Sequence, residues 1–214
     1  MISERPIVFS TPMVQAILSG EKTQTRRIAK LNAAGRVARG GKNWHPDDPE
    51  ATLACPYGQS EDSLWVRETW NGPFWNEDPY PANGYSPKYC KYKADGSKAP
   101  YYEDADGFIV ERWRPSIHMP RWAARITLAI TAVRLERLQD IGEEDAIAEG
   151  VERVCVGEGW RRYCDKDMEL PGVPPCRTAV DGFRTLWELI NGTDSWKINP
   201  WVWVVEFEKK ERPK

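Results

Sequence analysis

A lysine, a threonine and an arginine fall close together near the start of the chain, at Lys22, Thr25 and Arg27. A hydroxyl beside a cation can act as a nucleophile or orient a water molecule, because the positive charge lowers the cost of deprotonation and stabilises developing negative charge. In a regular strand Lys22 would share one face with Gln24. Thr25 and Arg27 would then share the other face. The structural alternative is a lysine that complements a helix end, followed by ordinary residues of a solvated strand.

A carboxylate that could transfer protons stands at Glu149, in the last turn of an expected helix. The acidic residues Glu143, Glu144 and Asp145 fall in the first turn, where negative charge interacts favourably with the helix dipole. At Glu149 negative charge opposes the dipole, so this carboxylate would hold a proton more readily, which suits a general acid or base. The alternative is a surface glutamate that costs roughly a few tenths of a kcal/mol.

Three short helices are expected to position these residues, over about 11–20, 143–149 and 181–191. Their caps and stops follow the usual preferences for small polar residues, proline and glycine. The residues that set these bounds are Thr11, Pro12, Gly20, Gly150, Asp181, Asn191 and Gly192. The third helix carries Phe183, Leu186, Trp187 and Ile190 at the spacing of one apolar stripe.

Five runs predict strands, at residues 7–9, 22–28, 64–69, 125–135 and 201–207. The last two runs alternate most clearly with a period of two. Several strands with a few short helices predict an α+β fold that is mainly β. A small barrel fits this pattern better than a doubly wound sheet does.

The 214 residues fit a single domain with insertions at about 29–61, 71–115 and 152–178. Connections of that length usually have a function. Trp75, in the second insertion, could stack on a base, whereas Trp187, Trp201 and Trp203 lie on periodic elements and are expected in the core.

The net charge and the pI limit the kinds of partner that the protein is expected to bind. A net charge of −2 and a pI of about 5.9 argue against a protein that grips long nucleic acid through phosphates alone. A single nucleoside, or RNA that meets a local basic patch, remains open. Arg121, Arg125 and Arg134 could form such a patch or a solvated strand edge.

The five cysteines form no Cys-x-x-Cys pair and there are only two histidines, so no metal site and no cofactor is expected. The first residues show no leader pattern, and the chain has no run of 18 apolar residues. We therefore expect no membrane association and a cytoplasmic location with reduced thiols.

The segment Gly20-Glu21-Lys22-Thr23-Gln24-Thr25-Arg26-Arg27 resembles the Gly-x-Lys-x-x-Glu-x-Arg motif of ASCH domains, small β-barrels of the PUA-like group. Thr25 stands where many members carry glutamate. Residues 138–150 resemble the helix segment of the family, and residues 62–68 resemble its Gly-Asp-x-Leu strand, with Glu61 in place of the usual glycine. The resemblance covers residues 5–30, 60–70, 113–151 and 180–208, about half of the chain.

The threonine variant is similar to a branch of ASCH domains related to 4-N-acetylcytidine amidohydrolase, which removes an acetyl group from the exocyclic amine of cytidine. The large insertions also resemble those of ASCH proteins encoded by phages and prophages. By position, the resemblance implies that Lys22, Thr25 and Glu149 are catalytic in a hydrolysis that needs no metal. Thr25 would be the nucleophile or would orient water, Lys22 would stabilise negative charge, and Glu149 would pass a proton to the departing amine.

Further residues are candidates for binding the substrate. Arg27 could hold ribose or phosphate, or could pair with a carboxylate such as Glu68. Arg67, Glu68 and Trp75 complete the expected substrate-binding set. Two other functions stay open: a module that binds RNA or a modified base without chemistry, and an ASCH-type ribonuclease. Thr25 favours the hydrolase, whereas the long aromatic loops favour a ligand larger than a nucleoside.

Overall fold

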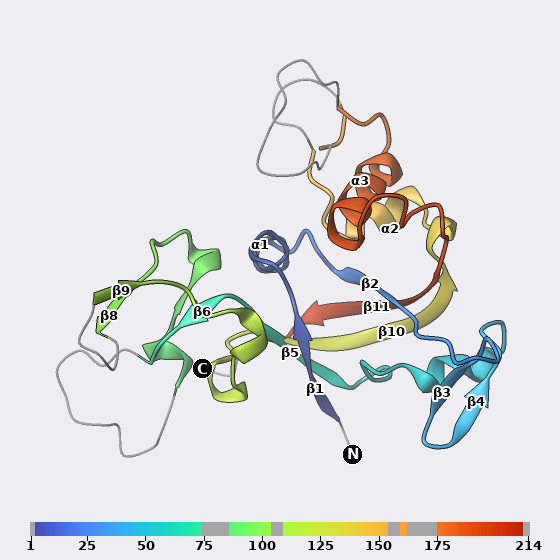
Figure 1. The fold of residues 1–214 in the computed structure, drawn as a ribbon, viewed down its shortest axis with the longest axis horizontal. Helices are drawn as coiled ribbons and strands as arrows, with labels where there is room; N and C mark the ends of the chain where they lie inside the picture. The colour runs from blue at the N-terminus through green and yellow to red at the C-terminus, as the bar shows by residue number, and fades with distance from the viewer. Residues whose placement is uncertain (1–2, 74–85, 104–108, 154–158, 162–174, 212–214) are drawn as a thin grey trace.

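The computed structural model describes residues 3–73, 86–103, 109–153, 159–161 and 175–211. A curved five-stranded sheet forms its centre (Figure 1). β1 pairs in parallel with β5, and the remaining neighbours are antiparallel. In sheet order the strands are β1 (Glu4–Val8), β5 (Ser63–Arg67), β10 (Thr127–Arg137), β11 (Trp201–Lys209) and β2 (Gln24–Ile28).

The fold is therefore α+β with mostly strands, as the sequence predicts. Among the described strands, however, no pairing joins β1 to β2, so the sheet does not close into the expected barrel. This leaves β2 as an edge strand. Its other side is free to contribute to a site, which a central strand could not do.

β11 separates the two larger parts of the hydrophobic core. Trp203, Val205 and Phe207 pack into a cluster with residues of β1, β5, β10 and α1 (Thr11–Ser19). Val202 and Val204 point the other way, into a cluster with α2 (Glu143–Ala148) and α3 (Ala179–Asn191). The alternation of apolar residues along this strand is thus an alternation between two buried faces. Trp187 and Trp203 are buried and Trp201 packs against the core, as expected.

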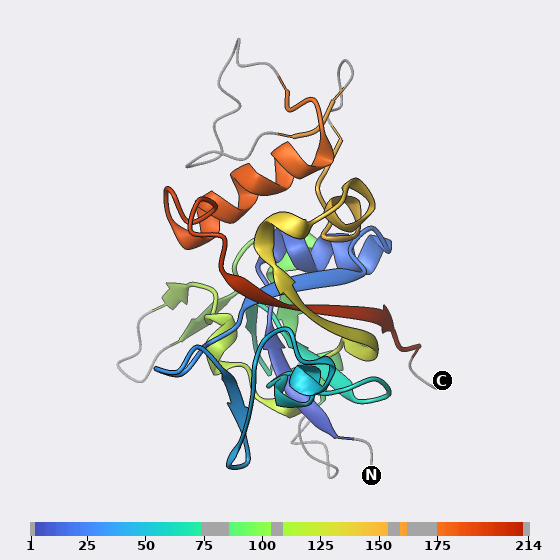
Figure 2. The same ribbon diagram turned by 90° about the vertical axis from the view of Figure 1, so that its right-hand side faces the viewer.

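The three helices gather near edge strand β2 (Figures 1 and 2), where α1 packs with residues on one face of β11 and α2 and α3 with residues on the other. Two of their starts differ from the expectation. Ser10, not Thr11, is the N-cap residue of α1, and Thr178, not Asp181, caps α3 by accepting a hydrogen bond from the backbone N–H of Asp181 at 3.0 Å. Their ends fall where the glycines predict, and Gly20 adopts the left-handed conformation with φ 84°.

The first two insertions contain more structure than long loops. In the first, β3 (Val37–Arg39) and β4 (Lys42–Trp44) form a hairpin. Val37, Ala51 and Cys55 enter the main core, so this insertion is part of the domain.

The second insertion contributes Tyr92 to a separate apolar cluster, whose other members Trp70 and Met119 lie on either side of it in the sequence. Its strands form two small two-stranded sheets. They are β6 (Trp70–Asn71), β7 (Lys91–Tyr92), β8 (Tyr101–Glu103) and β9 (Ile109–Glu111). Short 3-10 turns at Pro49–Ala54, Pro87–Tyr89, Lys93–Asp95, Ser116–His118, Arg121–Ala123 and Leu138–Asp140 complete the described elements. No helix within the described residues is long and apolar enough to cross a membrane.

Candidate functional site

Lys22 and Glu149, 127 positions apart in the chain, meet in a buried ion pair. Lys22 Nζ lies 2.9 Å from Glu149 Oε2 and also donates to the Glu149 carbonyl oxygen at 2.7 Å. Only 2% of Lys22 and 5% of Glu149 is exposed. The turn after α1 enforces this meeting, because the Lys22 N–H bonds to Ala16 O at 3.0 Å and the Thr23 N–H bonds to Ala148 O at 2.9 Å.

Arg26 belongs to the same charge network, and the sequence reasoning missed it. Its Nη1 donates to Glu149 Oε1 at 3.3 Å, and its Nη2 donates to Glu136 at 2.6 Å and to Asp145 at 2.8 Å. The strand period contained a usable signal, since Lys22, Gln24 and Arg26 follow one another at intervals of two. In the Gly-x-Lys-x-x-Glu-x-Arg motif, however, Arg26 occupies a variable position.

The electrostatics of the pair differ from the helix-dipole expectation. Burial lowers the pKa of Lys22; Glu149 opposes this shift, while the nearby charges of Arg27 and Arg26 add to it. Glu149 accepts hydrogen bonds from two cations, and these contacts are stronger than the field at the end of a six-residue helix. Its environment is therefore set by Lys22 and Arg26.

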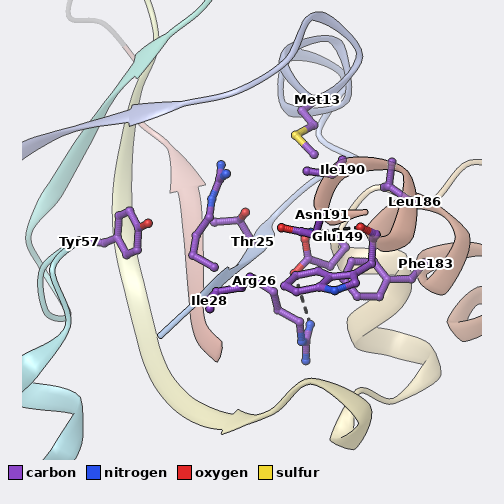
Figure 3. Close-up of a pocket in the computed structure, with 12 residues that line it drawn as sticks. Met13, Thr25, Arg26, Ile28, Tyr57, Glu149, Phe183, Leu186, Ile190 and Asn191 are labelled. Atoms are coloured by element: carbon purple, nitrogen blue, oxygen red, sulfur yellow. Dashed lines mark hydrogen bonds and ion pairs between the residues drawn. The ribbon is translucent and has the colours of Figure 1, made fainter. Parts of the chain in front are cut away.

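A cavity of about 180 Å³ opens beside this pair, at the outer side of edge strand β2. Thr25 and Glu149 both line it, with Arg26, Arg27 and Ile28 of the same strand. Figure 3 shows Thr25 and Glu149 approaching the cavity from β2 and from the end of α2. Lys22 does not line the cavity and reaches it through Glu149.

The opposite wall comes from α3, whose Trp187 was expected in the core. Phe183, Leu186, Trp187 and Ile190 line the cavity, as do Asn191, Met13 of α1 and Tyr57. The same apolar stripe thus packs on the core with Phe183 and Trp187 and faces the cavity with Leu186 and Ile190 (Figure 3). The helical period alone cannot tell which residues of the stripe pack in the core and which face the cavity.

Arg27 lines the cavity but does not form the suggested pair with Glu68. Its Nη2 donates to the carbonyl oxygen of Val8 at 2.7 Å, and its guanidinium lies 5.2 Å from the centre of the Phe9 ring. Lys22 Nζ approaches the same ring at 5.9 Å. These two cations therefore converge on one aromatic side chain.

Glu68 and Arg67 take part in other contacts and do not line the cavity. Glu68 accepts from Arg125 Nε at 2.9 Å and from Arg125 Nη2 at 3.0 Å, and burial raises the pKa of Glu68 while Arg125 lowers it. Arg67 donates to the carbonyl oxygens of Ile117 and Met119. Both residues connect the end of β5 to residues 117–125, which follow the second insertion.

Trp75 lies outside the described residues, as do Cys155 and Cys164. Among the residues that the structure covers, no group of three or more histidine, cysteine and carboxylate side chains could hold a metal ion. Thr25 and Glu149 give the described part of the cavity a hydroxyl and a carboxylate.

No family model, curated protein or solved structure matches this chain. The geometry of the site brings together a hydroxyl, a carboxylate and a buried ammonium group, with an apolar wall opposite.

Proposed function

We propose that this chain is a PUA-like protein of the ASCH type that hydrolyses an acylated nucleoside, with 4-N-acetylcytidine as the model substrate. One observation carries the proposal. The residues that the ASCH resemblance pairs across the chain, Lys22 and Glu149, are in contact at 2.9 Å, and Thr25 and Glu149 line one cavity. Residues so far apart in the sequence come into contact only where the fold brings them together.

The chemistry follows from which groups reach the cavity. A hydroxyl oxygen, that of Thr25 or of a water beside it, attacks the acyl carbon while Glu149 takes its proton. The carbon–nitrogen bond breaks, and Glu149 returns the proton to the departing amine. If Thr25 attacks, water then hydrolyses the acyl ester and releases the carboxylic acid. Lys22 is a positioning residue here, because it orients Glu149 and contributes positive charge from behind it.

The size of the cavity limits how much of a substrate can enter. Pockets for drug-sized ligands span roughly 300–1,000 Å³, and this cavity measures about 180 Å³. Because Thr25 and Glu149 line it, the part that enters must be the acylated edge of the base, and the ribose stays outside. The free nucleoside and an acylated cytidine within a short RNA are then both sterically permitted substrates.

The test is release of cytidine from 4-N-acetylcytidine by the wild-type protein and by three near-isosteric variants, Thr25→Val, Glu149→Gln and Lys22→Met. Loss of a group that transfers a proton or reacts should lower kcat by about 10²–10⁴-fold, so we expect this for Thr25→Val and Glu149→Gln. Thr23→Val is the matched control, because Thr23 is an exposed threonine two positions away. Its turnover should stay at the wild-type value.

Absence of turnover by the wild-type protein, together with salt-sensitive RNA binding, would replace this proposal with the binding module. One observation disfavours that outcome. Arg121, Arg125 and Arg134 each pair with a carboxylate, so the expected basic stripe is neutralised within the protein.

A further inference from the structure

The cavity beside Glu149 has a hydrocarbon lining as well as a polar one. Its aliphatic side chains come from both sides of the cavity, from the helices and from the edge strand (Figure 3). They are Met13 of α1, Ile28 of β2, and Leu186 and Ile190 of α3. The site can therefore hold a ligand that combines an apolar part with a polar part.

These aliphatic side chains are not closed off as core residues are. Ile28 is 47% exposed and Ile190 is 55% exposed, and Met13 is half-buried. Single exposed apolar residues are common on protein surfaces. Here, however, two of them stand on facing elements and border the same cavity as Thr25 and Glu149. A ligand that displaces water from this hydrocarbon gains free energy by doing so.

One part of an acylated nucleoside matches this surface. The base and the ribose carry hydrogen-bonding groups, which would lose their water partners and gain none against aliphatic side chains. The hydrocarbon of the acyl group has no polar atoms. The amide and the base can instead use the polar part of the lining, which includes Thr25, Tyr57 and Asn191.

An acetyl group is too short to use the aliphatic lining fully. Ile28 lies three residues beyond Thr25 on β2, a rise of about 10 Å along the strand. The methyl of an acetyl group is only one bond from the carbon that Thr25 or its water would attack. A longer chain that starts at the same carbon can extend towards Ile28 and Ile190.

We propose that the site prefers acyl groups longer than acetyl, of the butyryl or hexanoyl kind, whose hydrocarbon chain lies between β2 and α3; this inference rests on the proposed function. Thr25 and Glu149 act at the amide, and Ile28 and Ile190 cover the far end of the chain. These two isoleucines are then specificity-determining residues. The ASCH resemblance implies an acetyl group, so this preference goes beyond it.

The direct test compares 4-N-acetylcytidine, 4-N-butyrylcytidine and 4-N-hexanoylcytidine in the Thr25→Val variant, which should bind them without converting them. Isothermal titration calorimetry gives a Kd for each. One buried methylene corresponds to about 4-fold in affinity, so Kd should fall about 15-fold from acetyl to butyryl. Hexanoyl should bind more tightly still. Equal Kd values for the three compounds, or weaker binding of the longer ones, overturn the proposal.

A matched pair of variants locates the effect on the cavity. Ile190→Ser, added to Thr25→Val, should reduce the preference for butyryl over acetyl by about 4-fold, the contribution of one methylene. Leu189→Ser is the control, because Leu189 is the adjacent residue of α3, is 40% exposed and does not line the cavity. It should keep the full preference. An equal loss in both variants would contradict the role of Ile190.

The two proposals fail in distinguishable ways. Turnover of 4-N-acetylcytidine with no gain in affinity for longer chains refutes the acyl preference and leaves the hydrolase in place. A gain in affinity along the series, without turnover of any of the three by the wild-type protein, refutes the hydrolase and retains the apolar subsite. Neither turnover nor a gain in affinity refutes both.

Discussion

Replacing Glu149 with glutamine should destabilise the fold far more than replacing its partner Lys22 with methionine. Glutamine keeps the shape and an acceptor oxygen, so the change isolates the loss of one negative charge. That charge faces Lys22 and Arg26 directly, and Arg27 adds a third positive charge nearby. Without it, Lys22 becomes a buried ammonium group among cations.

The magnitude follows from burial. Removing one partner of a buried pair costs about 3–5 kcal/mol, because the other charge is left uncompensated. For a chain of this size each kcal/mol lowers Tm by about 2–4 °C, so Glu149→Gln should lower Tm by about 6–20 °C. Lys22→Met removes a group whose burial is already unfavourable, as its lowered pKa indicates, and Glu149 keeps Arg26 at 3.3 Å. Its cost should be about 1 kcal/mol, that of one carbonyl left without a donor.

The double variant provides the decisive measurement. Urea unfolding at pH 7 should show that adding Lys22→Met to Glu149→Gln raises stability, since it removes the stranded cation. Asp194→Asn is the control, because Asp194 and Lys197 form a pair at 2.6 Å with both side chains mostly exposed. It should leave the unfolding midpoint unchanged. A double variant less stable than Glu149→Gln alone would refute this reasoning.

Three further predictions concern the same framework. Gly150→Ala and Gly20→Ala impose the same backbone strain, because φ is 83° at Gly150 and 84° at Gly20. A Cβ at Gly150 would meet Lys22 Cβ at 3.1 Å, whereas a Cβ at Gly20 would face open space. Only Gly150→Ala should therefore lower turnover, with Tm measured for both variants. Because the pKa of Lys22 is lowered, the unfolded chain binds more protons at this group between that pKa and 10.5, so Lys22 contributes stability that rises with pH there, against the opposite contribution of Tyr57 and Tyr92, whose pKa values are raised; Lys22→Met should remove the rising contribution in denaturation curves. The backbone N–H groups of Ser3 and Gln59 lower the pKa of Asp62, so its stabilisation is present above pH 3.8 and lost as pH falls through the lowered pKa; Asp62→Asn should remove this acid dependence.

The sequence predicted best those features that depend on neighbouring residues. Gly20, Gly150 and Gly192 mark the helix ends because glycine adopts their positive φ values more readily than other residues do. The alternation in 201–207 predicted β11 because a strand has a period of two. The start of α3 was wrong because two residues with oxygen-bearing side chains, Thr178 and Asp181, lie one turn apart and either could cap it.

Contacts between residues far apart in the sequence were harder to predict. Glu68 was named as one possible partner of Arg27, but the structure pairs it with Arg125 at 2.9 Å. Nothing local distinguishes these arginines, because the choice depends on where β5 and the 3-10 turn at Arg121–Ala123 meet. The pairing of Lys22 with Glu149 is different. It was anticipated only because a family resemblance linked the two segments, since no periodicity relates positions 127 apart.

The edge position of β2 explains why this part of the molecule can hold a site at all. A central strand would use both sides in pairing, whereas β2 pairs only with β11 among the described strands. Its outer side faces α3 across the cavity, and four consecutive residues, 25 to 28, line it. Thr25 and Arg26 alternate between the two faces of the strand, yet both reach the cavity because it wraps around the edge. The hydroxyl can therefore face a ligand from one side of β2, while Arg26, on the other side, holds the carboxylate that would receive its proton.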